Sequence, residues 1–270
     1  MRIGFVGCGA AGRALAVAWH RAGHEIGSIV TRNSSNEVVA SIGAGVADGP
    51  FDDADVVIFA TPDDTLAGVA AHHRLTSSQV ALHLSASHPS TILEPTGAKT
   101  AGLHPLRAFA DLETAVASLP GTYFFVEGEA ADTAEQLARD IGGIPSRIAT
   151  EKKMLYHAGA TLAANYTVAL VARACRLFGE AGVEKATAQA ALLRLARGAL
   201  DNVEKSGLAR GLTGPVTRGE ARLVEQHLLA VDAETRALLA RLIEATIPLA
   251  EEKGTLSPEA AAALRRIVQS

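Results

Sequence analysis

Hydrophobic residues in the first half of the chain form short runs separated by longer amphipathic stretches. The apolar runs fall at residues 2–6, 25–30, 55–60, 80–84, 99–103 and 122–126. Helical patterns lie between them at 34–42, 64–71 and 129–141. Short apolar runs without alternation are typical of strands buried on both faces. Strands that alternate with helices favour a doubly wound parallel sheet, so the fold class predicted here is α/β.

The pattern changes near residues 142–145, and no convincing strand follows Thr150. Residues 151–181 could form one helix of about thirty residues, which is long for a globular protein. Further helical patterns occupy 184–205, 218–229, 233–252 and 258–268. We therefore expect two domains, a Rossmann-type α/β domain over 1–150 and an all-α domain over 151–270.

The first apolar run ends in a glycine motif, Gly7-x-Gly9-x-x-Gly12, and an alanine-rich helical pattern follows it. A G-x-G-x-x-G that closes a strand and opens a helix indicates a dinucleotide site. Gly7 would allow the turn, Gly9 would let the backbone approach a pyrophosphate, and Gly12 would let the helix pack on the strand. The N–H groups and dipole of the helix start also favour phosphate. A glycine-rich turn in another kind of α/β protein is the alternative.

The end of the second strand indicates which dinucleotide is bound. A carboxylate there would hold the ribose hydroxyls of NAD. Here the sequence is Thr31-Arg32-Asn33-Ser34, and the first acid is Glu37. A guanidinium and hydroxyl groups suit a 2′-phosphate, so we expect NADP(H). The alternative is that Arg32 is a solvated surface residue.

Polar residues follow the later strands, where ligands of open α/β sheets bind. Thr61 and Pro62 should border the nicotinamide ribose, although a plain turn capped by Asp63 or Asp64 is an alternative. The segment 85–88 and His104 end the next two strands. The residues expected to hold the cofactor are Gly7, Gly9, Ala10, Ala11, Gly12, Thr31, Arg32, Asn33, Ser34, Thr61, Pro62 and Ser85.

The start of the long helix carries candidate catalytic groups. Lys153 and His157 are one turn apart and share a face, and Asn165 lies further along the same side. Carbonyl reduction needs a proton donor, which a lysine or histidine can supply. The alternative is a snorkelling lysine and a hydrogen-bonded histidine at the domain interface.

Composition narrows the possible partners and the compartment. The net charge is −4, and no long basic run is present, so we expect neither nucleic acid nor membrane as a partner. The apolar stretch 158–172 is shorter than the ~20 residues of a membrane span, and a strand at the first residues leaves no room for a secretory signal. Two cysteines build no disulfide framework and fit the cytoplasm. No histidine pair has metal-ligand spacing.

Several motifs occur together in an order that resembles a known group. They are Leu82-His-Leu-Ser-Ala-Ser87, Gly102-Leu-His-Pro-Leu106 with Phe109, Lys153-x-x-Tyr156-His157-Ala, Ala164-Asn-Tyr166 and Leu212-Thr-Gly-Pro215-x-x-Arg218-Gly219. The chain resembles a Rossmann-like oxidoreductase family long classed as a domain of unknown function, some members of which are the alternative type of ketopantoate reductase. It is more distantly similar to 6-phosphogluconate dehydrogenase, pyrroline-5-carboxylate reductase and ordinary ketopantoate reductase.

The resemblance implies catalytic roles for Lys153 and His157, beside which Asn165 is the third catalytic candidate, and a homodimer formed through the helical domains. In 6-phosphogluconate dehydrogenase a lysine and an asparagine one turn apart open the long helix. Lys153 matches the lysine here, whereas His157 stands where the asparagine would be, which leaves its role open. The residues expected to position the substrate are Ser87, His104, Thr213 and Arg218.

A small carboxylate substrate needs a cation, and a guanidinium fork matches a carboxylate. Arg218 is the candidate in the helical half, with a surface pair to Glu220 or Glu225 as the alternative. The expected function is NADPH-dependent reduction of a small keto- or imino-carboxylate, with ketopantoate as the leading substrate. The alternatives are a non-catalytic nucleotide-binding sensor or partner-binding module, and reduction of a deazaflavin by NADPH.

Overall fold

The computed structural model describes residues 1–31, 45–46, 51–109 and 111–269. Its described residues divide into two compact units, Met1–Ala163 and Ala164–Ser270. This division lies inside the long helical stretch, beyond the predicted boundary at residue 150. The start of that stretch belongs with the sheet because Lys153 and Tyr156 bond to Glu127 and His104 of the first unit.

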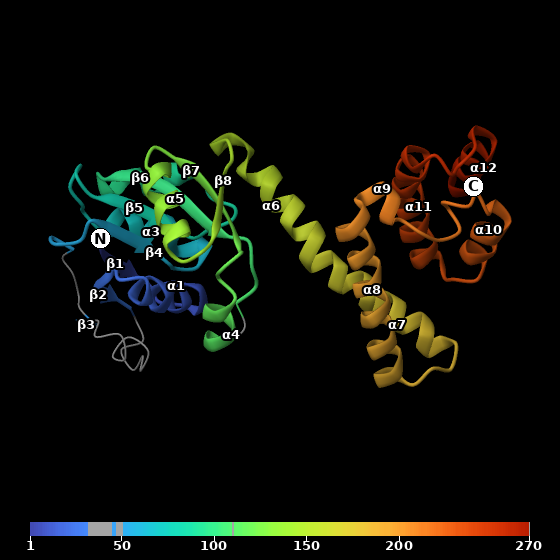
Figure 1. Ribbon diagram of the computed structural model, residues 1–270, viewed down its shortest axis with the longest axis horizontal. Helices are drawn as coiled ribbons and strands as arrows, with labels where there is room; N and C mark the ends of the chain where they lie inside the picture. The colour runs from blue at the N-terminus through green and yellow to red at the C-terminus, as the bar shows by residue number, and fades with distance from the viewer. Residues whose placement is uncertain (32–44, 47–50, 110, 270) are drawn as a thin grey trace. The chain divides into compact units, whose positions relative to one another are not determined.

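The first unit is built on a sheet that has eight strands in the described part of the chain, in the order β3-β2-β1-β4-β5-β6-β7-β8. Figure 1 shows these strands in the part of the molecule that contains the N-terminus. The elements of this part are β1 Arg2–Val6, α1 Ala10–Arg21, β2 Glu25–Val30, β3 Gly45–Val46, β4 Val56–Phe59, α3 Asp63–His72, β5 Val80–His83, the 3₁₀ helix η1 Ser90–Thr96, β6 Lys99–Pro105, α4 Leu112–Ala117, β7 Tyr123–Gly128, α5 Ala131–Asp140 and β8 Ile144–Arg147.

The six strands β3 to β6 pair in parallel, in the order that dinucleotide-binding sheets use. The α/β fold predicted from the sequence is confirmed, with one difference. Strand β7 runs antiparallel to β6. The connection between them holds the six-residue helix α4, whose Ala115 and Val116 pack into the core beside α1. The strands β3 and β8 were not predicted, and the helix expected at 34–42 lies outside the described residues.

Side chains alternate between the two faces of the sheet, and each face has its own core. Val56 and Ile58 join the cluster formed with α1, α4 and α5, whereas Val57 and Phe59 join the cluster formed with α3 and η1. This is the period of two expected of a strand covered on both sides. The indole of Trp19 adds a buried hydrogen bond to the carbonyl of Leu137 at 2.8 Å, which ties α1 to α5.

From Thr150 onward, all of the secondary structure assigned in the described residues is helical. The elements are η2 Thr150–Lys152, α6 Lys153–Thr161, the π-helix η3 Leu162–Tyr166, α7 Thr167–Glu180, α8 Lys185–Ser206, α9 Leu208–Gly211, α10 Ala221–Leu229, α11 Ala233–Lys253 and α12 Pro258–Gln269. The stretch predicted as one long helix is thus helical throughout but changes type. Asn165 lies in its π-helical turn, a feature that occurs often at functional sites.

The second unit has a small core of its own between α10, α11 and α12, which includes Val224, Ile247 and Leu264. Helices α7 and α8 lie side by side in Figure 1, and Arg173 of α7 forms an ion pair with Glu234 of α11 at 2.5 Å. No helix among the described residues is both long and apolar enough to cross a membrane.

Candidate active site

The glycine loop between β1 and α1 forms the bottom of the first part of the site. Gly7 has a φ of +83°, and a Cβ there would lie 2.7 Å from the carbonyl oxygen of Ala60. A Cβ on Gly12 would lie 2.9 Å from the Cβ of Ala60, whereas a Cβ on Gly9 would meet nothing within 4 Å. Gly7 and Gly12 therefore serve the turn and the helix packing predicted for them. The open space at Gly9 leaves room for a ligand at the start of α1.

A cavity of about 780 Å³ lies over this loop, where the strand order reverses between β1 and β4. It is lined by Val6, Gly7, Cys8, Gly9, Arg13, Val30, Thr31, Ala60, Thr61, Pro62, Thr65, Val69 and His73. The hydroxyl of Thr61 is buried and has no hydrogen-bond partner among the described residues. The open space at Gly9, the buried hydroxyl of Thr61 and the guanidinium of Arg13 near the start of α1 are groups that could bind the phosphates of a dinucleotide.

Apart from Gly12, described above, and Ser85, described below, the predicted cofactor residues divide into three groups. Gly7, Gly9, Thr31, Thr61 and Pro62 line the cavity, and Ala10 and Ala11 form the first turn of α1. Neither Asp63 nor Asp64 caps α3, since the N-cap is Pro62 without a side-chain bond. Arg32, Asn33 and Ser34 lie outside the described residues, so the prediction of a 2′-phosphate contact remains open. Arg13 also lines the cavity and was not predicted, although its place just after Gly12 could have indicated it.

The central feature of the second part of the site is a buried ion pair between Lys153 and Glu127. Lys153 opens α6 and Glu127 lies on β7, and their side chains are only 2% and 1% exposed. The Lys153 Nζ donates to Glu127 Oε1 at 2.8 Å. Glu127 also accepts from the backbone N–H of Ser90 and from the hydroxyls of Ser90 and Thr150. Such bonds offset the cost of removing two charges from water.

The neighbouring strand β6 makes room for this pair with a glycine. Gly102 is opposite Glu127 in the sheet. A Cβ at Gly102 would collide with both Glu127 Oε1 and Lys153 Nζ. The glycine quoted in the motif Gly102-Leu-His-Pro therefore leaves space for the ion pair in its present position, and its own backbone conformation does not call for a glycine.

Burial and neighbouring charges set the protonation of the groups around Lys153. Burial lowers the pKa of Lys153, and the carboxylates of Glu127 and Asp63 oppose that shift. Burial and the Lys153 charge hold the pKa of His83 well below its usual range, so this ring on β5 is neutral. A lysine that is charged but has a lowered pKa releases a proton more readily than one in water.

His104 on β6 contacts helix α6 through Tyr156. Its Nδ1 shares a hydrogen bond of 2.6 Å with the hydroxyl of Tyr156, and the Tyr156 ring packs on Phe125 with centroids 4.6 Å apart. Burial and the charges of Lys153 and His157 lower the pKa of His104 to about 4, and burial raises the pKa of Tyr156 to about 12. Both groups are therefore neutral at pH 7 and can hydrogen-bond a ligand without adding charge.

Ser85 and Ser87 meet at one carboxylate after β5. Their hydroxyls donate to Asp63 Oδ2 at 2.8 Å and 2.7 Å. Asp63 begins α3, next to Thr61 and Pro62 of the first cavity. The ends of β4 and β5 thus come together as predicted, but the two serines are anchored by an acid that the sequence had suggested only as a helix cap.

Of the remaining predicted residues, His157 lies on α6 in the first unit, where its Nδ1 is buried without a hydrogen-bond partner among the described residues. Asn165, Thr213 and Arg218 lie in the second unit. Asn165 is exposed in η3. Arg218 forms a two-bond pair with Glu220, at 2.8 Å and 2.9 Å. This is the surface pair considered above as the alternative to a substrate contact. Thr213 directly precedes Gly214. The hydroxyl of Thr217 donates a hydrogen bond of 2.8 Å to the carbonyl oxygen of Gly214.

Besides Arg13, four residues of the site had no functional role assigned from the sequence, namely Asp63, His83, Glu127 and Tyr156. Glu127 carried a signal, because it directly follows the apolar run 122–126, the kind of position from which polar residues after other strands were selected. Tyr156 and His83 stood inside quoted motifs but had no assigned role. Within the described residues no group of three or more His, Cys, Asp or Glu side chains could hold a metal ion.

Two family models match successive parts of the chain. Residues 2–86 match the family described as NADP oxidoreductase, coenzyme F420-dependent. Residues 122–254 match the family described as a domain of unknown function, DUF2520. The chain is a Rossmann-like oxidoreductase. NADP is the nucleotide named for the family that matches the glycine loop, and this confirms the predicted cofactor.

This oxidoreductase is also similar to solved structures over nearly its full length. Protein TM1727 from Thermotoga maritima is 27% identical, with 93% of this chain and 99% of that chain covered and a TM-score of 0.81. A reductive aminase from Aspergillus terreus in complex with NADPH and ethyl levulinate is 17% identical, with 98% of each chain covered and a TM-score of 0.62. A 1-pyrroline-5-carboxylate reductase from Streptococcus pyogenes is 17% identical, with 93% and 98% covered and a TM-score of 0.64. No curated protein sequence matches the chain.

Proposed function

We propose that this oxidoreductase uses NADPH to reduce a small carboxylate that carries a keto or imine group, with ketopantoate as the first substrate to test. The observation that carries the proposal is the buried Lys153–Glu127 pair. It supplies a charged proton donor close to Asp63, His83 and His104, at the carboxyl ends of the strands beside the glycine loop.

NADPH, when bound, supplies the hydride. The chain supplies the proton and the orientation. Lys153 Nζ gives one proton to the oxygen or nitrogen that becomes negative as hydride arrives, which lowers the barrier in the manner of a general acid. His104 and Ser87 hydrogen-bond the substrate as neutral groups. His157, one turn after Lys153 on α6, is a further group proposed to contact the substrate. Substrate contacts by Asn165, Thr213 and Arg218 stay predictions from the sequence.

The test of the reaction is NADPH oxidation by the purified protein with a panel of 2-keto acids, cyclic imines and a deazaflavin. We expect turnover with keto or imino acids. Turnover with the deazaflavin alone would replace the proposed substrate class. NADPH binding without turnover of any compound would favour a non-catalytic nucleotide-binding protein.

Arg32 provides the prediction for cofactor choice. We expect wild-type protein to bind NADPH more tightly than NADH, because no carboxylate follows Val30 and a guanidinium is available there. Arg32→Ala should weaken NADPH binding by about 1.5–3 kcal/mol, the value of a charge-assisted bond, and leave NADH binding unchanged. Calorimetric titration of both proteins with both nucleotides measures this. Equal wild-type affinity for the two nucleotides would contradict the prediction.

Arg218 provides the prediction for substrate binding. If its guanidinium exchanges Glu220 for a substrate carboxylate, Arg218→Ala should raise KM by about tenfold or more and leave NADPH affinity intact. Arg222→Ala is the matched control, because Arg222 is an exposed arginine on α10. An unchanged KM would leave Arg218 with only its surface pair to Glu220.

We also propose that the protein is a homodimer through its helical part and that it works in the cytoplasm. No residue of α7 is buried within the chain, and Val168, Leu195 and Leu200 are 70%, 69% and 62% exposed. A surface of this kind is typical of an interface.

Light scattering should give twice the chain mass of 27.9 kDa. Leu195→Glu should shift the protein toward monomer, whereas Leu229→Glu should not, although Leu229 is 68% exposed on α10. A monomeric wild type would contradict the proposal.

A further inference from the structure

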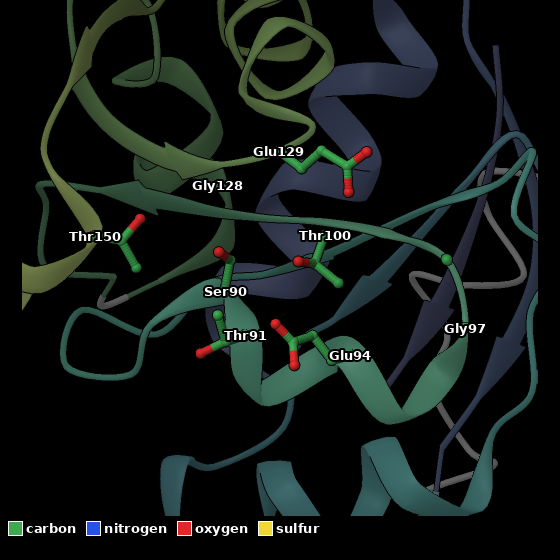
Figure 2. A pocket seen from close by; sticks show the side chains of 9 residues that line it. Ser90, Thr91, Glu94, Gly97, Thr100, Gly128, Glu129 and Thr150 are labelled. Atoms are coloured by element: carbon green, nitrogen blue, oxygen red, sulfur yellow. The ribbon is translucent and has the colours of Figure 1, made fainter.

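A second cavity, of about 450 Å³, opens to solvent beside β6 and β7. Figure 2 shows it between the helical turn that carries Ser90, Thr91 and Glu94 and the strand that leads to Gly128. Its lining has no residue in common with the cavity over the glycine loop. The reaction as proposed above does not use it.

This cavity is connected to Lys153 through Glu127. Ser90 and Thr150 line the cavity, and the hydroxyl groups of both residues donate to Glu127 Oε2, at 2.8 Å and 3.0 Å. The other oxygen, Oε1, accepts from Lys153 Nζ at 2.8 Å. A continuous chain of hydrogen bonds therefore runs from the wall of the cavity to the buried ammonium group.

The proposed reaction gives Lys153 a need for such a connection. Each turnover removes one proton from Nζ, and the side chain is only 2% exposed. A bound substrate and nucleotide would also exclude water from the side where the proton is used. The amine must regain its proton before the next turnover. A proton route that does not pass through the substrate-binding side of Lys153 would allow this while that side is closed to water.

We propose that the second cavity is the entrance through which solvent protons return to Lys153, by way of Ser90 or Thr150 and Glu127. This inference rests on the proposed function, because it requires Lys153 to donate a proton in each turnover.

The step conserves atoms and charge. A hydronium ion or buffer acid in the cavity gives a proton to the hydroxyl oxygen of Ser90 or Thr150, while the hydroxyl's own proton moves to Glu127 Oε2. A rotation of the carboxyl group brings the protonated oxygen to Nζ, which takes the proton. Glu127 is again a carboxylate and Lys153 again an ammonium, and no electrons are transferred.

The charges on the cavity wall suit this role. Glu94 and Glu129 both line the cavity, and two carboxylates raise the local concentration of cations, including hydronium and cationic buffer acids. Figure 2 shows the two carboxylates on opposite walls, Glu94 from the helical turn and Glu129 just after Gly128.

The test is a double variant, Ser90→Ala with Thr150→Val, that removes both hydroxyls from the chain and keeps Glu127 and Lys153. Stopped-flow absorbance with the best substrate of the panel should show a first turnover of NADPH within about twofold of wild type, because Lys153 begins protonated. The steady-state rate should fall by about tenfold or more, since general acid–base steps contribute about 10²–10⁴-fold. Imidazole buffer should restore the rate, whereas sodium chloride at equal ionic strength should not.

Thr91→Ala is the matched control, because Thr91 lines the same cavity without being one of the two hydroxyl donors to Glu127. It should retain the wild-type steady-state rate. If the double variant unfolds, the single variants Ser90→Ala and Thr150→Val are compared in the same way. An unchanged steady-state rate, or equal losses in the first and later turnovers without rescue by imidazole, would overturn the inference and leave the proposed function standing. Absence of wild-type turnover with every compound would overturn both.

Discussion

Replacing Lys153 by methionine should lower kcat by about 10²–10⁴-fold and leave the affinity for NADPH unchanged. A general acid typically contributes a factor of this size, and Lys153 is the cation that the fold buries close to Asp63, His83 and His104. It does not line the cavity over the glycine loop, so nucleotide binding should survive. The measurements are kcat from NADPH oxidation and Kd from calorimetric titration.

The control for this substitution concerns stability. Removing the lysine leaves the Glu127 carboxylate buried without its cation, and breaking a buried pair from one side costs about 3–5 kcal/mol. The double variant Lys153→Met with Glu127→Gln should recover most of the lost unfolding free energy, because the charge is gone, and should remain inactive. Retention of near wild-type kcat by Lys153→Met would show that the lysine is only an interface residue.

Replacing Glu127 by glutamine should move the alkaline limb of the kcat/KM profile to lower pH by about one to three units. An opposite charge in contact shifts a pKa by about that amount, and Glu127 is the largest influence that raises the pKa of Lys153. The protonated lysine is the donor, so the rate falls as pH rises through its pKa. Without the carboxylate that pKa is lower, and the fall begins at lower pH.

The pH profile distinguishes an effect of Glu127 on the pKa of Lys153 from a purely structural role of Glu127. Glutamine keeps an oxygen that can accept from Ser90 and Thr150, so the fold should persist. Glu113→Gln removes an exposed carboxylate on α4 and should leave the profile in place. If the Glu127→Gln profile coincides with that of wild type, another group is the titrating acid.

The nucleotide half could be predicted because its signals are local. A strand, a tight turn and a helix start are specified by consecutive residues. The positive φ of Gly7 and the close approach of Gly12 to Ala60 follow from the spacing of the motif. The two-faced burial of β4 likewise follows from its continuous apolar run. The sequence therefore determined the parallel part of the sheet and the glycine turn that leads into α1. The place of the cofactor stays a prediction.

The partners of Lys153 could not be predicted, because they come from distant segments. Glu127 lies 26 residues away from Lys153 along the chain, and Ser90 lies 37 residues away from Glu127. Only the pairing of β6 with β7 brings Gly102 opposite the carboxylate and leaves space for the ammonium. The antiparallel direction of β7 was also missed, since apolar runs do not specify the direction of a strand.

What the sequence by itself determined is a dinucleotide-binding sheet followed by helices, with a lysine and a histidine one turn apart at the start of the helical region. What only the tertiary structure decided is the environment of that lysine. Its burial, its counterion and the hydroxyls behind Glu127 depend on packing between strands and a helix start that are not adjacent in the chain. The physical reason is that local sequence fixes backbone conformation and periodicity, whereas desolvation and charge pairing exist only where separate elements meet.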